Sequence, residues 1–114
     1  MPLALFAGIR VSDLARAQDW YERLLGSEPT FFPNDVEAVW ELAENRSVYI
    51  EQADRDVGGG LVTLFLDDLD AFVDAASGRG VEPDLRETYE NGVRKVTYRD
   101  PDGNELGCGG APIA

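Results

Sequence analysis

The sequence contains no histidine and only one cysteine, Cys108, among its 114 residues. A single cysteine cannot close an internal disulfide, and no cysteine pair is present to hold a zinc ion. Without histidine the chain cannot assemble a serine–histidine–aspartate triad, and no imidazole can activate Cys108 as a nucleophile. These absences exclude the common nucleophilic hydrolases, and the lack of disulfides leads us to expect a cytoplasmic protein.

Basic residues are also scarce. Ten lysines and arginines face 22 aspartates and glutamates, which gives a net charge of −12. Such a chain has too few cations to neutralise phosphates, so we expect neither nucleic acid nor an anionic membrane surface as a partner. The apolar start, residues 1–9, is too short to span a membrane. The acidic balance favours a cationic ligand, although it also serves solubility.

A predicted strand followed by a predicted helix occurs twice in the sequence, at a constant offset of 55 residues. Apolar and polar residues alternate over residues 3–11, which predicts a strand, and an apolar stripe of helical spacing follows until Gly26. The same strand and helix pattern returns over residues 60–66 and 69–78. The candidate helix N-caps are Ser12 or Asp13 in the first half and Asp67 or Asp68 in the second, and the candidate end of the second helix is Gly78 and Gly80.

Three shorter strand candidates follow each helix, at residues 30–32, 36–42, 47–52, 85–90, 93–99 and 105–109. Turns are predicted at 33–35, 44–46, 91–92 and 101–103 because proline, asparagine and glycine gather there. The predicted fold is α+β: two βαβββ modules, residues 1–52 and 60–114, joined by a linker at 53–59 and forming a curved mixed sheet around a cleft. A ferredoxin-like βαββαβ order is the structural rival, and the three strands after each helix disfavour it.

Two motifs resemble the vicinal oxygen chelate superfamily, which includes glyoxalase I, extradiol dioxygenases and bleomycin-resistance proteins. They are the opening run Gly8–Leu14, continued by Trp20-Tyr21 and Leu24–Gly26, and the closing run Tyr98–Asn104. The resemblance covers essentially the whole chain and implies the glyoxalase-like fold. It also implies one divalent metal in the family's enzymes, held by His, Glu or Gln from the first and last strand of each half.

Transferred residue by residue, the resemblance puts three of the four metal positions on side chains without donor atoms. These are Phe6, Leu61 and Gly107, and the fourth position falls on Glu51. We therefore predict that the protein uses no metal and no other cofactor. The alternative is a metal-dependent lyase or isomerase resembling glyoxalase I, with Glu51 and Glu105 as its donors.

An apolar cleft floor with a few polar groups at its rim is typical of a small-molecule pocket. We predict a homodimer that sequesters a drug-like, cationic or aromatic small organic ligand, as bleomycin-resistance proteins do. Two alternatives stay open: an interaction module whose cleft is filled by its own side chains, and metal-free acid–base catalysis by Glu51 or Tyr49. Which face of its strand Trp40 occupies is not settled by the pattern. The predicted ligand-binding residues are Phe6, Trp40, Tyr49, Glu51, Leu61, Thr63, Lys95 and Glu105.

Overall fold

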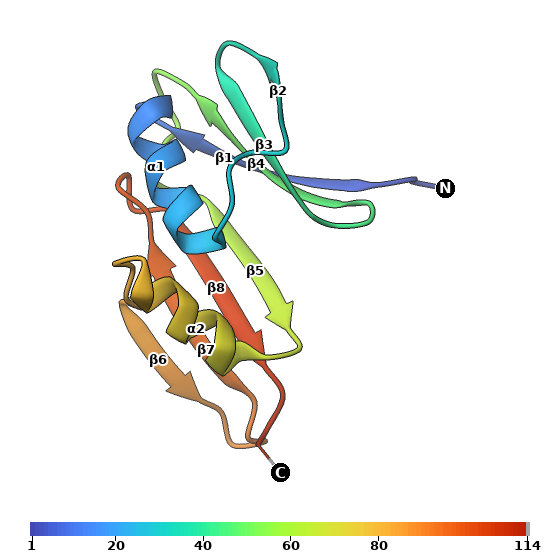
Figure 1. The fold of residues 1–114 in the computed structure, drawn as a ribbon, viewed down its shortest axis with the longest axis vertical. Helices are drawn as coiled ribbons and strands as arrows, with labels where there is room; N and C mark the ends of the chain where they lie inside the picture. Colours follow the sequence, from blue (N-terminus) through green and yellow to red (C-terminus); the bar gives the residue numbers. More distant parts are fainter. Residues whose placement is uncertain (114) are drawn as a thin grey trace.

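Each half of the chain forms a four-stranded mixed sheet with one helix against one of its faces (Figure 1). The structure is a computed structural model and describes residues 1–113. The first module contains β1 (Leu5–Val11), α1 (Leu14–Leu25), β2 (Phe31–Asn34), β3 (Glu37–Ala43) and β4 (Arg46–Gln52). The second contains β5 (Leu61–Leu66), α2 (Leu69–Gly78), β6 (Leu85–Thr88), β7 (Arg94–Arg99) and β8 (Glu105–Gly110).

The strand orders are β1-β4-β3-β2 and β5-β8-β7-β6, with the first and last strand of each module parallel. The predicted α+β fold with two βαβββ modules is confirmed, and the ferredoxin-like order is wrong. The duplication is visible in the register, because β1 and β5 pair with β4 and β8 in the same way.

Both helices begin where an aspartate accepts a hydrogen bond from the backbone N–H three residues further on. Asp13 caps α1 and Asp68 caps α2, at 3.1 and 3.0 Å. Helix α1 ends at Gly26, whose φ of +83° lies in the left-handed region that glycine tolerates best. Helix α2 ends at Gly78, its C-cap is Arg79, and the left-handed residue follows at Gly80. The sequence therefore placed the helix ends to within one residue.

One predicted turn is displaced. Pro33 and Asn34 belong to β2 rather than to the turn, which lies at residues 35 and 36. Strand β2 is at the edge of its sheet, where the missing N–H of a proline costs no ladder hydrogen bond. The side chain of Asn34 then accepts a hydrogen bond from the backbone N–H of Val36 and stabilises the turn.

The buried carboxylate of Asp100 connects the two modules. The hydroxyl of Tyr21, on α1, donates to Asp100 Oδ2 at 2.8 Å, and Asn104 Nδ2 donates to the same oxygen at 2.8 Å. Two backbone N–H groups, of Asp102 and Asn104, donate to Oδ1 at 2.9 Å. Asp100 is only 5% exposed, so these four donors replace the water that a buried carboxylate needs. The closing motif thus joins the second module to α1.

Asn104 and Arg79 extend this junction. Asn104 Nδ2 also donates to the carbonyl of Arg10, and its Oδ1 accepts from the N–H of Gly60. Arg79 donates to the carbonyls of Arg23 and Leu24 at the C-terminal end of α1, where cations are favourable. Together these contacts fix the β7–β8 turn and the end of α2 against the first module.

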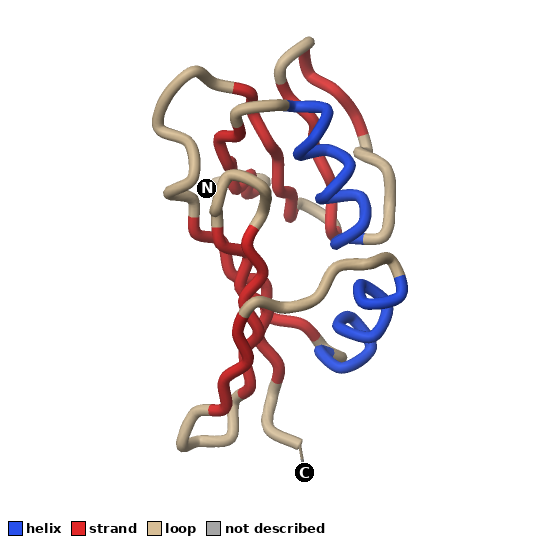
Figure 2. The backbone as a smooth tube through the Cα atoms, turned by 90° about the vertical axis from the view of Figure 1, so that its left-hand side faces the viewer, coloured by secondary structure: helices blue, strands red, loops and turns tan. Residues whose placement is uncertain are grey.

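Both helices lie on the same side of the molecule, and the other faces of both sheets point away from them (Figure 2). We call these the open faces of the first and second sheet. The core lies between sheets and helices and contains Ile9, Val11, Tyr21, Leu24, Trp40, Val48, Ile50, Tyr98, Leu106 and Cys108. No helix in residues 1–113 combines the length and apolar character needed to cross a membrane.

Candidate ligand-binding site

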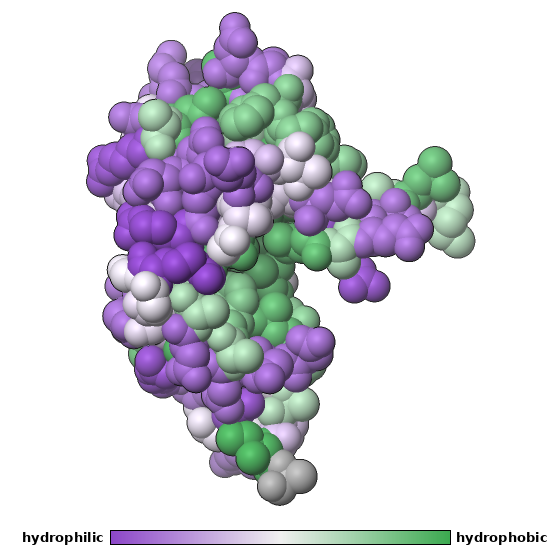
Figure 3. Space-filling view, in the orientation of Figure 1, coloured by the Kyte–Doolittle hydropathy of each residue, from purple (hydrophilic) through white to green (hydrophobic). Residues whose placement is uncertain are grey.

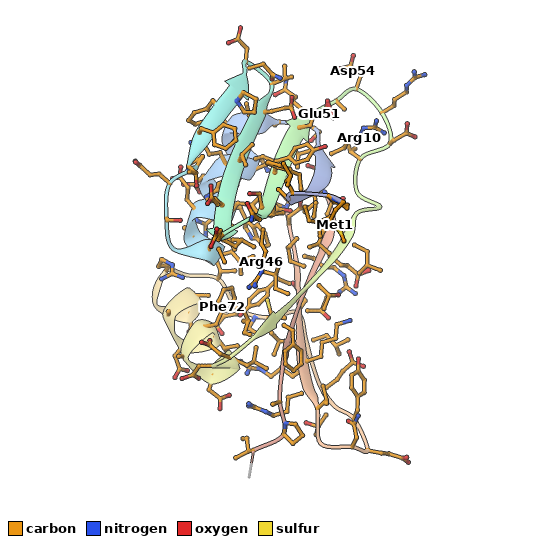
Figure 4. All side chains as sticks on the ribbon, turned by 90° about the vertical axis from the view of Figure 1, so that its right-hand side faces the viewer. Met1, Arg10, Arg46, Glu51, Asp54 and Phe72 are labelled. Atoms are coloured by element: carbon orange, nitrogen blue, oxygen red, sulfur yellow. The ribbon has the colours of Figure 1, made fainter. Side chains whose placement is uncertain are left out.

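The open face of the first sheet carries the polar residues that the sequence predicted for a site. Side chains alternate along a strand, so Ile9 and Ile50 point to the core while Arg10, Tyr49 and Glu51 point the other way. Strands β1 and β4 pair in parallel, with Arg10 directly beside Glu51. Figure 4 shows Arg10 and Glu51 near the linker loop that carries Asp54.

A pocket of about 500 Å³ lies on this face, and we call it the Tyr49 pocket. Its volume falls within the range of about 300–1,000 Å³ typical of small-molecule sites. Strands β1 and β4 form its floor, and the linker forms one wall, tied down by an ion pair of 3.6 Å between Arg10 Nη1 and Asp56 Oδ2. The lining residues are Gly8, Ile9, Arg10, Tyr49, Glu51, Asp56, Val57, Gly59 and Gly60.

The tyrosine ring of this pocket lies directly over Gly8. A Cβ atom added to Gly8 would lie 2.4 Å from Cζ and 2.5 Å from Oη of Tyr49. Only glycine leaves room for the ring in this position, because real side-chain carbons do not approach so closely. The ring therefore rests on the backbone of β1 and offers its other face and its hydroxyl to the pocket.

Carboxylates dominate the charge of the pocket. Glu51 lies directly opposite Glu37 of β3, and like charges in such a pair repel each other. The side chain of Asn34 donates a hydrogen bond to Glu37, while Glu51 forms no ion pair among residues 1–113. Since Arg10 is paired with Asp56, Glu51 keeps a half-buried charge that a bound cation would stabilise.

The open face of the second sheet is flatter and more apolar. The ring of Phe65 covers Gly109, and the stem of Lys95 covers Gly107, where an added Cβ would lie 2.8 Å from Lys95 Cε. Thr63 lies beside this lysine stem, since its Oγ1 is 3.3 Å from the same added Cβ. Glu105 is 3.9 Å from Arg99, so its charge is already compensated. This face offers surface rather than a pocket.

Phe6 and Leu61 do not meet in a shared cleft within one chain. Phe6 is 51% exposed and Leu61 69% exposed, and neither lines the Tyr49 pocket. Strands β1 and β5 are the unpaired edges of their sheets, so no hydrogen bonds draw the two open faces together. Within one chain, Phe6 and Leu61 therefore lie on two separate open faces, and their joint role in a ligand site stays a prediction.

Trp40 was predicted to contact the ligand, but the structure places its side chain in the core. It points to the helix side of β3, is 1% exposed, and donates from Nε1 to the carbonyl of Ser27 at 2.9 Å. Its ring packs on Tyr21 in the core. Strand alternation allows either face for Trp40, and the burial of its large apolar ring decides for the core. Trp40 thus offers no surface to a ligand on the open face.

Strand register separates Glu51 from the other metal position of its own half. Glu51 lies beside Arg10, which is four residues beyond Phe6. At about 3.3 Å per residue this is about 13 Å along the strand, whereas two ligands of one ion lie within a few ångströms of each other. A residue at the position of Phe6 and the carboxylate of Glu51 cannot bind the same ion.

The internal repeat assigns the fourth position to Tyr49 instead. In the second half, the metal position on the first strand is Leu61, whose neighbour on β8 is Glu105. The position on the last strand, Gly107, lies two residues beyond Glu105. In the first half, the neighbour of Phe6 on β4 is Ser47, and the residue two positions beyond Ser47 is Tyr49. In residues 1–113, no three His, Cys, Asp or Glu side chains lie close enough together to hold a metal ion. The donor set therefore does not fit the metal that the family's enzymes hold.

Three polar residues of this face were not predicted from sequence, namely Arg10, Glu37 and Asp56. Arg10 shares the strand face of Phe6 and Gly8, so alternation could have found it. Glu37 lies in the predicted strand 36–42, where alternation alone does not say which face is functional, and Asp56 lies in a linker whose path no local pattern predicts. Cys108 is fully buried, and burial raises the pKa of its thiol to about 12, which agrees with the expectation that it is not a nucleophile.

Comparison with known proteins identifies the family. Residues 4–107 match the family model described as the Glyoxalase/Bleomycin resistance protein/Dioxygenase superfamily. The crystal structure of a glyoxalase/bleomycin resistance protein from Catenulispora acidiphila DSM 44928 is 52% identical, with a TM-score of 0.94 over 97% of this chain and 100% of that one. No curated protein matches the sequence.

More distant structures share the fold. A lactoylglutathione lyase from Agrobacterium tumefaciens has a TM-score of 0.73 at 22% identity, covering 96% of this chain and 95% of that one. A bleomycin-binding protein complexed with bleomycin has a TM-score of 0.75 at 19% identity, covering 94% and 97%. With two βαβββ modules, the closing motif at their junction and a family match across residues 4–107, this chain belongs to the glyoxalase/bleomycin resistance protein/dioxygenase superfamily.

Proposed function

We propose that the protein binds and sequesters a small organic ligand that combines an aromatic or apolar body with a cationic group. The observation that carries this proposal is the Tyr49 pocket itself, where the carboxylate of Glu51, which has no ion-pair partner among residues 1–113, lies on the same strand face as the half-buried ring of Tyr49. A cation gains from the ring face and from Glu51 together, and the charge of −12 attracts it over longer distances. Bleomycin, the ligand of a structural relative, is one candidate.

Isothermal titration calorimetry with matched aromatic compounds tests this proposal. Cationic compounds and bleomycin are expected to bind, and neutral or anionic compounds of the same size are not. Glu51→Gln should weaken cation binding about tenfold or more, because a hydrogen-bonded charge is lost. Glu44→Gln, in an exposed turn away from the pocket, removes the same charge and serves as the control. Equal loss in both variants would contradict a role for Glu51.

A metal-dependent lyase remains the alternative from another functional class. The donors named for it, Glu51 and Glu105, lie on the sheets of different modules, and within residues 1–113 no third His, Cys, Asp or Glu completes a metal site with them. Elemental analysis of the purified, dialysed protein distinguishes the two functions. One equivalent of a tightly held divalent ion would contradict the proposal, whatever the result of the titrations.

We further propose that the protein acts as a homodimer. A second hollow, of about 670 Å³, opens between the modules where the start of β1 and the end of β5 diverge, and we call it the notch. Figure 3 shows apolar residues gathered there below the N-terminal strand, and Figure 4 places Arg46 and Phe72 on its two sides. Leu5 and Phe65 line it and are 72% and 67% exposed. Exposed apolar edge strands of this kind favour pairing with another chain.

A second copy of the chain fits the notch because the same edges of β1 and β5 are present on both copies. A two-fold contact would bring β1 of one copy beside β5 of the other and unite an open face from each. Analytical ultracentrifugation tests this: Phe65→Glu should give a monomer at concentrations where the unmodified protein is dimeric. Phe32→Glu changes another exposed phenylalanine, which is 54% exposed and lies on β2, and should leave the dimer intact. The single buried cysteine suits the reducing cytoplasm that we propose as its location.

A further inference from the structure

A third hollow lies on the helix side of the second sheet, whereas the Tyr49 pocket lies on the open face of the first sheet. It has a volume of about 210 Å³ and lies between the first turn of α2 and strands β6 and β7. We call it the Arg86 hollow. Leu69 and Val73 of α2 form its apolar wall, and Arg86, Thr88 and Arg94 lie on the sheet side. Asp70, Glu87, Lys95 and Val96 complete the lining.

The two arginines give this hollow a positive charge in a strongly acidic chain. Arg94 Nη1 contacts Asp70 Oδ1 at 2.7 Å, so that pair is neutral. Arg86 is exposed to solvent and forms no ion pair with any residue in 1–113, so its guanidinium is free to contact a ligand. Glu87 and Lys95 also line the hollow and are cross-strand neighbours on β6 and β7, so the charges of these two residues offset each other.

The hollow also has a hydrogen-bond donor without a partner among residues 1–113. Arg94 Nε is buried and has no hydrogen-bond partner within residues 1–113. Thr88 pairs with Arg94 across the two strands, which puts its hydroxyl on the same face as both guanidinium groups. Donors therefore outnumber acceptors in the hollow, and a ligand that supplies acceptor oxygens would correct this imbalance.

We propose that the Arg86 hollow binds a small carboxylate with a short apolar group. The guanidinium of Arg86 matches the two oxygens of a carboxylate, and Leu69 and Val73 accept the apolar part. The volume equals that of about seven water molecules, well below that of a drug-sized site. This excludes the ligands proposed for the Tyr49 pocket and makes the hollow a separate, second site.

Two-dimensional NMR titration with isobutyrate and isobutyramide tests the proposal, because the two probes share their shape and differ in charge. Isobutyrate should shift amide signals of residues 69–73, 86–88 and 94–96, and isobutyramide should not. Arg86→Gln should weaken isobutyrate binding about tenfold, and Arg86→Lys should lie in between, since it keeps the charge and loses the planar fork.

Arg99→Gln is the matched control, because Arg99 lies on β7, is exposed, and changes the net charge equally. It should leave isobutyrate binding unchanged. The proposal is overturned if Arg99→Gln weakens binding as much as Arg86→Gln, if isobutyrate shifts signals elsewhere or none, or if inorganic phosphate binds more tightly than isobutyrate. Glu51→Gln should not change isobutyrate binding, so failure of the Tyr49 pocket and failure of this hollow are distinguishable.

Discussion

Removing the hydroxyl of Tyr21 should loosen the junction between the modules. The hydroxyl is the only contact from α1 to the buried carboxylate of Asp100, at 2.8 Å, and Tyr21 itself is fully buried. In Tyr21→Phe the acceptor oxygen keeps its second donor, Asn104 Nδ2, so the carboxylate is not left unpaired. The loss is then one hydrogen bond to a charged group, about 1.5–3 kcal/mol of unfolding free energy.

Urea unfolding followed by circular dichroism measures this loss. The control is Tyr89→Phe, because Tyr89 is 45% exposed and should cost less than about 0.5 kcal/mol. Asp100→Asn should cost more than Tyr21→Phe, because an amide N–H would then face a donor. The double variant should be less destabilised than the sum, since both changes remove the same contact. Strict additivity, or a Tyr21→Phe loss no larger than the control, would refute the idea that this bond holds the modules together.

Three further outcomes are expected. Gly8→Ala should displace the ring of Tyr49, destabilise the protein by about 1–3 kcal/mol and reduce ligand binding in calorimetry. Gly78→Ala, on α2 and outside the Tyr49 pocket, has no atom within 4 Å of the added Cβ and should do neither. The thiol of Cys108, with a pKa of about 12, should react with a thiol reagent only as fast as the protein unfolds, and rapid reaction of native protein would contradict its burial. Burial raises the folded-state pKa of Cys108 from 9.0 and that of Tyr98 from 10.0, both to about 12, and it raises the pKa of Tyr21 as well. The stability that these neutral groups contribute is therefore complete below pH 9 and should fall as the pH rises from 9 to 12. A urea midpoint that stays constant over that range would contradict this.

The sequence alone was sufficient for the secondary structure and its order. Strand alternation, aspartate caps and turn glycines are local features, and local physics decides them. The displaced turn at Pro33 shows the limit of this reasoning. Whether a proline breaks a strand depends on the position of that strand in the sheet, which is a tertiary property.

The candidate site was predictable in part. Tyr49 and Glu51 share a strand face, and the structure places both in one pocket. Trp40 was assigned to the site because alternation alone does not say which face is buried. The assignment of a metal position to Glu51 stays a prediction, and the register that places Glu51 beside Arg10 cannot be read from either strand by itself.

What the sequence determined by itself is the repeated unit, the identity of its helices and strands, and the lack of histidine. These follow from the side chains and their spacing along the chain. Only the tertiary structure decided the pairing register, the junction around Asp100, and the separation of the two open faces. These depend on contacts between residues far apart in sequence, whose free energy is gained only after the modules have packed together.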